Sequence, residues 1–167
     1  MDNTETVKIT LAQALKFKKR LVGKMQELFN LAVVSNVYFE DDPLPESKNA
    51  RTLLEKYFVL SEAVVTLKAI IEKANLPQAY NLAKLAESKS TLSNFRMLST
   101  TTGIQHLGLD SKGVQVIRRR VAFLEYDDVK AITNSLESTI ASLQDELDTF
   151  NASTKVTIPA CINEFCK

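Results

Sequence analysis

The chain has 167 residues, the length of one ordinary domain or of two long helical hairpins, so we expect no second catalytic domain in it. Basic and acidic side chains nearly cancel, at 21 and 20, and 45% of the residues are apolar, which excludes a disordered composition. One histidine, two cysteines and four glycines leave little material for a zinc site, a histidine-dependent nucleophile or a glycine-rich phosphate loop. We therefore expect a protein without metal, cofactor or catalytic activity.

The N-terminal residues are acidic, and no apolar run approaches the roughly 18 residues that a membrane span needs. We expect a cytoplasmic protein with no membrane partner. The two cysteines, Cys161 and Cys166, lie close to the C-terminus, and in a reducing compartment we expect both to be free thiols.

Two long helices are predicted in the first half of the chain. Apolar residues recur at steps of three and four over 10–34, and a regular heptad pattern follows over 50–75. The segment between them contains the acidic, proline-bearing run 40–45, which cannot continue a helix. The two helices should therefore form an antiparallel hairpin. The heptad positions of the second helix are Leu53, Tyr57, Leu60, Val64, Leu67, Ile71 and Ala74.

The second half should hold two further helices and two strands. Pro77 opens a third helix that ends before 100–103, and Asp127 or Asp128 caps a fourth helix that runs to about Thr149. Apolar, mostly β-branched or aromatic residues over 113–126 predict a strand, and 154–158 has a similar composition. We expect these two strands to pair with each other. His106 is interpreted as a loop residue.

Together these elements predict a mainly α fold, with a long antiparallel helical hairpin or bundle of about four helices and a small two-stranded β-ribbon near the C-terminus. The whole chain, residues 1–167, is expected to form a single helical domain. Residues 1–9 and 159–167 are expected to be flexible or docking tails.

Charge is unevenly distributed along the chain. The first helix is basic and the fourth is acidic, so the two could attract each other within one chain or between chains. Contact of the first helix with nucleic acid is not expected, because the net charge is only +1. The basic residues are Lys16, Lys18, Lys19, Arg20 and Lys24, and the acidic ones are Asp127, Asp128, Glu137, Asp145, Glu146 and Asp148.

Half of the arginines of the chain are consecutive. In a strand, Arg118 and Arg120 point to one face and Arg119 to the other. Guanidinium groups bind phosphates and carboxylates through two parallel hydrogen bonds, so we take these arginines and the nearby Tyr126 as candidate ligand-binding residues. The alternative is that the arginines pair with the acidic fourth helix, or keep the edge of a ribbon too charged to aggregate.

Short motifs in order along the chain resemble a small bacterial and phage-encoded helical family often labelled septicolysin-like. Its opening L-A-E-A-L-x-x-R-x-D-L is similar to Leu11–Leu15 followed by the basic Lys18 and Lys19 and by Leu21, with a basic residue in place of the aspartate. The shortened third helix and the added residues 159–167 also depart from the pattern. The resemblance implies an oligomeric bundle of long helices with a β-ribbon, and no established enzymatic activity. Further similar pieces are 39–43, 71–75, 120–123 with 127–129, 150–151 and 154–158.

These observations favour a non-catalytic, homo-oligomeric binding protein that holds a small anionic ligand at the arginine-bearing strand. In its most specific form, such a protein in a phage would sequester a nucleotide signal of the host, such as a cyclic nucleotide. The alternative is a protein-interaction scaffold or minor structural component with no small ligand. A third reading, an enzyme using carboxylates and arginines, ranks last because no metal-ligand cluster is apparent.

Overall fold

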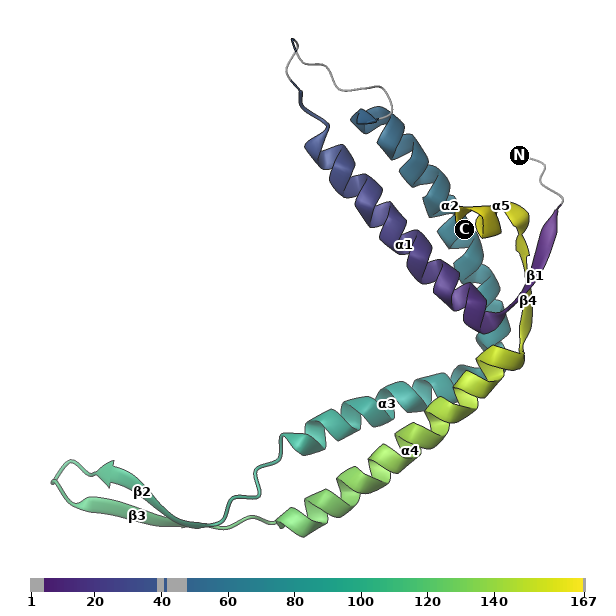
Figure 1. The fold of residues 1–167 in the computed structure, drawn as a ribbon. Coiled ribbons are helices and arrows are strands. Elements are labelled where there is room, and N and C mark those ends of the chain that lie inside the picture. The colour runs from purple at the N-terminus through teal and green to yellow at the C-terminus, as the bar shows by residue number, and fades with distance from the viewer. Residues whose placement is uncertain (1–4, 39–40, 42–47, 167) are drawn as a thin grey trace. The chain divides into compact units, whose positions relative to one another are not determined.

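The computed structural model describes residues 5–38, 41 and 48–166, and most of the acidic segment 40–45 lies outside them. The fold is mainly α-helical with small antiparallel β elements, as predicted, although these form two two-stranded sheets instead of the single ribbon expected (Figure 1). Contacts divide the chain into two compact units, Met1–Ala79 with Asp148–Lys167, and Tyr80–Leu147. Within the described ranges, no helix combines the length and apolar character needed to cross a membrane.

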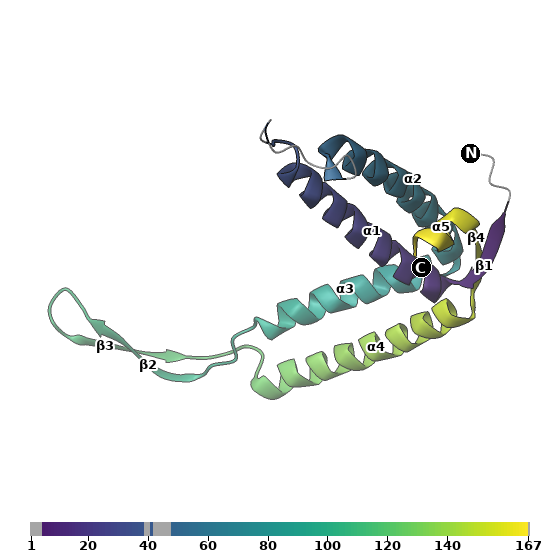
Figure 2. The ribbon, with the colours of Figure 1, turned by 45° about the horizontal axis from the view of Figure 1, so that its top comes forward.

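The first unit is built on the helices α1 (Leu11–Val34) and α2 (Ala50–Asn75), which lie side by side in both views (Figures 1 and 2). Both helices match the predicted ranges closely. A capping box starts α1: the Thr10 hydroxyl accepts from the Gln13 amide at 3.1 Å, and the Gln13 side chain accepts from the Thr10 amide at 2.9 Å. The Asn49 side chain caps α2 by accepting from the Thr52 amide at 2.8 Å.

The core of the first unit lies where the predicted helix seams meet. On α1, Leu11, Ala14 and Leu21 are fully buried. The α2 heptad faces them, and strand and C-terminal residues close the cluster. Burial of so many apolar side chains makes this cluster the main source of stability in the unit. The other buried members are Ile9, Leu60, Ala63, Val64, Leu67, Ile71, Val156, Ile158, Ile162 and Cys166.

A two-stranded antiparallel sheet joins distant parts of the chain in the first unit. The strand β4 (Lys155–Pro159) is confirmed, but its predicted pairing with the strand at 113–126 is wrong. It pairs instead with β1 (Thr6–Thr10), with Ile9 opposite Val156. The physical reason is burial: β1 directly precedes α1, so pairing with it places the apolar residues of both strands in the α1–α2 core.

The C-terminal residues dock rather than fray. After β4, a short helix α5 (Ala160–Phe165) packs on the core, and Ile162 is only 1% exposed. Two basic side chains of α1 hold its end, because Arg20 Nη1 donates to the Cys166 carbonyl at 2.9 Å and Lys24 Nζ to the Phe165 carbonyl at 2.6 Å. At the other end, residues 6–9 belong to β1. Neither tail region is without structure in the described residues.

The second unit contains α3 (Ala79–Arg96), which follows the short 3-10 helix η2 (Leu76–Gln78), and most of α4 (Tyr126–Ser153). The two helices meet through a small cluster of Leu85, Leu143 and Leu147. Polar contacts flank it: Asn81 Nδ2 donates to Glu146 Oε1 at 2.6 Å. Arg96 pairs with Glu137 at 2.6 Å, with both side chains exposed. Such a pair contributes only about 0.2–1 kcal/mol, so this unit has the thinner core.

A β-hairpin connects α3 to α4. Its strands are β2 (Gly103–Leu109) and β3 (Gln115–Arg120), and they pair with each other alone. Of the strand predicted over 113–126, only 115–120 forms β3, and Tyr126 instead begins α4. The partner strand β2 contains His106, which the sequence pattern placed in a loop. The turn between them is stabilised by Asp110, whose Oδ1 accepts from the amides of Lys112 and Val114, each at 2.8 Å.

Candidate functional site

The register of the hairpin fixes which residues accompany each arginine. Arg120 lies opposite Gly103 and Arg118 opposite Gln105, whereas Arg119 lies opposite Ile104. Paired residues share a face of the ribbon, so Arg118, Arg120, Gln105 and Gly103 together form one face, here called the arginine face. Arg119 belongs to the other face, as the predicted alternation requires.

The arginines of β3 are exposed and lack an internal acidic partner in the part of the chain that the structure describes. None of the three makes a side-chain hydrogen bond or ion pair there. The suggested pairing with the acidic α4 is not seen among these residues: Glu137 pairs with Arg96, and Glu146 accepts from Asn81. The guanidinium groups are therefore available to a molecule outside the chain.

The structure separates Tyr126 from the arginine strand. Tyr126 is the first residue of α4, its side chain is exposed, and Lys130 Nζ lies 5.6 Å from its ring centroid. It lines a small cavity of about 220 Å³ where α3 ends and α4 begins. No hydrogen bond or ring contact among the described residues joins it to the arginines. The other lining residues are Phe95, Arg96, Leu98, Thr100, Val129, Lys130 and Thr133.

The single histidine lies in a strand rather than in a loop. His106 is part of β2, and its Nδ1 lies 3.1 Å from Nε2 of Gln115 on β3. Its paired neighbour across the ribbon is Ile117, so His106 is on the face opposite the arginine face. It is thus a strand residue in a cross-strand contact, away from the candidate anion contacts.

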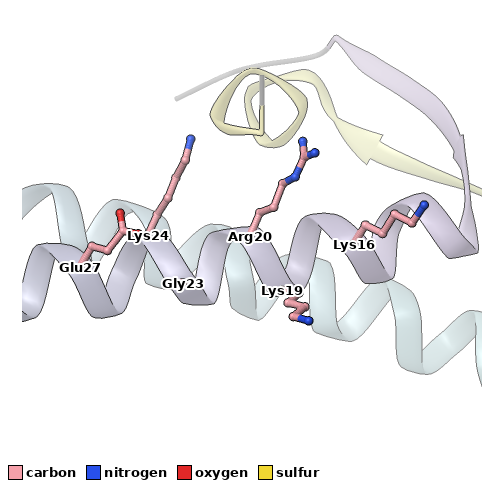
Figure 3. A pocket seen from close by; sticks show the side chains of 6 residues that line it. All are labelled: Lys16, Lys19, Arg20, Gly23, Lys24 and Glu27. Carbon is pink, nitrogen blue, oxygen red and sulfur yellow. The ribbon is translucent and has the colours of Figure 1, made fainter.

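A larger concave site lies on α1, and the sequence pattern did not single it out as a pocket. It is an open groove of about 530 Å³ over Gly23, here called the α1 groove. The signal present in the sequence is a glycine among cations that are its helical neighbours three, four and seven residues away. Figure 3 shows Lys16, Arg20 and Lys24 projecting on the side of α1 where α5 lies. The lining residues are Lys16, Lys19, Arg20, Gly23, Lys24 and Glu27.

The end of α5 borders this groove and carries a buried thiol. Cys166 is 4% exposed, and its Sγ lies 3.9 Å from the Phe17 carbonyl oxygen. Burial raises the pKa of the Cys166 thiol, and the positive charges of Lys24 and Arg20 partly oppose that increase. Cys161 is half-buried, and both cysteines are free.

Comparison with known proteins gives no match for this chain, whether with family models, with curated proteins or with solved structures.

Proposed function

We propose that this protein is a non-catalytic, homo-oligomeric binding protein that holds a small anionic ligand, such as a nucleotide, on the arginine face of the β2–β3 hairpin. The observation that carries the proposal is the exposure of Arg118 and Arg120 on one face without an acidic partner among the described residues. Two like charges side by side on a ribbon repel each other, so a bound anion would relieve that repulsion.

The arrangement suits phosphate groups. Alternate residues of a strand are about 6.6–6.8 Å apart, so each of the two guanidinium groups can bind its own phosphate or share one between them. Gly103 opposite Arg120 has no side chain, and a Cβ built there meets nothing within 4 Å, so a ligand can approach the backbone. Gln105 adds an amide that can both donate and accept.

An isolated two-stranded hairpin is at best marginally stable in water. Both strands of this hairpin are mostly exposed, and Ile104 and Ile117 share its second face. Assembly of several copies through this second face would cover Ile104 and Ile117 and leave the arginine faces accessible to a ligand. This is why the proposal couples ligand binding to a homo-oligomer.

A second apolar surface supports assembly of copies through α1 and α2. Val22 and Phe29 are 48% and 45% exposed on α1, and Phe58 and Val65 are 63% and 58% exposed on α2. Each pair is spaced by seven residues, so it repeats on one face of its helix. Tyr57 joins the two pairs, with its ring centroid 5.9 Å from that of Phe29 and 5.6 Å from that of Phe58.

This surface lies away from α5. Val22 is two residues from both Arg20 and Lys24, which contact α5, so its side chain is about 160° around the helix from theirs. Heptad-spaced apolar residues on two antiparallel helices form a seam that a second identical hairpin can complete as a four-helix bundle. The occupant proposed for this surface is therefore a second copy of the chain.

The ligand is tested by calorimetric titration with a panel of linear and cyclic nucleotides. We expect saturable binding that is lost in the double variant Arg118→Gln with Arg120→Gln. The matched control is Arg119→Gln, which changes a charge on the same strand but on the other face, and it should bind at least one third as tightly as the wild type. Absence of binding, or equal losses in both variants, would contradict the ligand proposal and favour a scaffold without a small ligand.

The assembly is tested by light scattering coupled to size-exclusion chromatography. We expect the wild type to elute as an oligomer and Phe58→Glu to dissociate, because a carboxylate would be buried without a partner in the seam. Tyr80→Glu, which changes an exposed aromatic residue outside the seam, should leave the oligomer intact. A wild type that is monomeric at all concentrations would overturn this part of the proposal.

A further inference from the structure

The α1 groove carries a charge density that the net charge of the chain conceals. Over the residues Leu11–Gln26 the helix has five cations and no acidic residue. Four of the five cations line the groove, together with the single acid Glu27 at one end. Cations this close on one helix repel one another, so the bare surface is electrostatically unfavourable and an anion bound there would stabilise it.

We propose that the α1 groove is a separate site for a small anion with several phosphate groups, recognised through its phosphates. Lys16, Arg20 and Lys24 follow one another at four-residue steps, so they present positive charge about every 6 Å along one face. Figure 3 shows Lys19 pointing away from Arg20 and Lys24, on the opposite side of the helix. The row spans about 12 Å of helix, which suits an anion whose charges are spread along its length.

Gly23 makes the groove. Every other residue among the six that line it has a long side chain, whereas a Cβ added at Gly23 would meet nothing within 4 Å. Glycine in a helix interior costs about 0.5–1 kcal/mol relative to alanine, and nothing packs closely on it here to require its small size. A glycine here leaves space for a ligand, and this can explain why a residue that destabilises the helix is present.

Two of the cations are already held in position. Arg20 and Lys24 each donate one hydrogen bond to a carbonyl at the end of α5. Each keeps further N–H donors: a guanidinium has five in total and an ammonium three. Because these contacts restrict the side chains before the ligand arrives, less conformational entropy is lost on binding.

The lining also predicts that the base of a nucleotide contributes little to binding. Its six residues include no aromatic ring on which a base could stack. The one acidic residue, Glu27, follows Lys24 along the helix and would repel an anion that extended past it. A volume of about 530 Å³ is within the usual range for small-molecule sites. Affinity should therefore depend on the number of phosphates and hardly on the base.

The probe for calorimetric titration is inorganic tripolyphosphate, followed by adenosine triphosphate and adenosine monophosphate. We expect the first two to bind with similar affinity, and the monophosphate to bind at least tenfold more weakly. In the variant Lys16→Gln with Lys19→Gln we expect roughly a ten- to thirtyfold loss, because each exposed charge contact contributes up to about 1 kcal/mol. The α1 side chains that donate to the end of α5 are those of Arg20 and Lys24, so loss of Lys16 and Lys19 should leave the fold intact.

Two further variants keep the result decisive. Lys18→Gln with Lys68→Gln removes the same charge from the same unit outside the groove, and its affinity should stay within threefold of the wild type. Gly23→Leu fills the groove without changing charge and favours the helix, so it should lose tripolyphosphate binding in a stable protein. Equal losses in the two lysine pairs, or full affinity in Gly23→Leu, would overturn the proposal.

The arginine-face variant separates this site from the proposed function. If Arg118→Gln with Arg120→Gln retains tripolyphosphate binding, the α1 groove stands as an independent site whatever the fate of the hairpin proposal. If that variant loses the binding while the Lys16 and Lys19 variant keeps it, the anion binds at the hairpin and the groove proposal fails.

Discussion

Cys166 shows how a single buried group links the stability of the first unit to pH. Its thiol is enclosed between α5 and α1, and burial favours the neutral form over the thiolate. The folded-state pKa is therefore higher than the usual value of 9.0. A group with a raised folded pKa contributes stability below its unfolded pKa, and this contribution is lost as the pH rises through the folded value.

We accordingly expect the free energy of unfolding of the wild type to fall more steeply than that of Cys166→Ala as the pH rises above 9.0. Urea denaturation at several pH values measures both slopes. Deprotonation of lysines affects the two proteins alike, so the difference between them isolates the thiol. Cys161→Ala serves as control and should keep the wild-type slope; parallel slopes for wild type and Cys166→Ala would contradict the prediction.

At the scale of residues, the sequence was enough to predict which side chains share a face of a strand. It was not enough to predict which residues from elsewhere in the chain surround them. The alternation of Arg118, Arg119 and Arg120 follows from strand geometry alone, and the register agrees with it. Tyr126 was expected in the same strand as the arginines, but it is the first residue of α4. The groove over Gly23 was missed because a glycine in a helical pattern says nothing of the side chains that surround the gap.

At the scale of elements, the capping box at Thr10 fixes where β1 ends and α1 begins. Thr10→Ala removes the hydroxyl that accepts from the Gln13 amide and should destabilise the first unit by about 1 kcal/mol. Urea denaturation followed by circular dichroism measures the change. Thr102→Ala, which changes an exposed threonine between α3 and β2, is the control, and a loss of equal size there would argue against the cap.

The turn of the hairpin depends on Gly113. Its φ of +77° is a backbone conformation that favours glycine, and its amide donates to the Asp110 carbonyl at 3.0 Å. Gly113→Ala should therefore weaken the hairpin by about 1 kcal/mol and lower nucleotide affinity, if binding requires the paired strands. Cross-strand nuclear Overhauser effects between Gln105 and Arg118 report the pairing. Unchanged cross-strand signals in Gly113→Ala would refute the role of the turn.

The helices were predictable and the strand pairings were not, for one physical reason. Helical spacing is a local property, so 10–34 and 50–75 could be assigned from their own residues. Pairing of β1 with β4 depends on contacts between residues more than 140 positions apart. The five residues of β1 alternate Val7 and Ile9 with polar neighbours, a pattern too short to identify a partner.

At the scale of the whole molecule, burial is concentrated in the first unit. Among the described residues, its cluster contains thirteen buried side chains, whereas the cluster of the second unit contains Leu85, Leu143 and Leu147. Local opening free energies follow such differences in burial. The helices α1 and α2 should therefore be the slowest-exchanging part of the molecule.

Amide hydrogen exchange with mass spectrometry tests this expectation. We predict that peptides from α1, α2 and β4 exchange at least a hundredfold more slowly than those from β2 and β3. Addition of a nucleotide that binds the arginine face should slow exchange in β2 and β3 alone. Uniform protection over both units in the free protein would contradict the prediction.

The β1–β4 sheet also sets the order in which the molecule can be completed during synthesis. Translation at about 5–20 residues per second takes roughly 7–30 s to produce the chain between Thr10 and Lys155. Throughout that interval β1 has no partner, and the α1–α2 hairpin lacks Val156, Ile158 and Ile162. The first unit is thus the first to be synthesised and the last to complete its core. A chain that stops before Lys155 leaves the largest core of the molecule exposed to water and to other nascent chains.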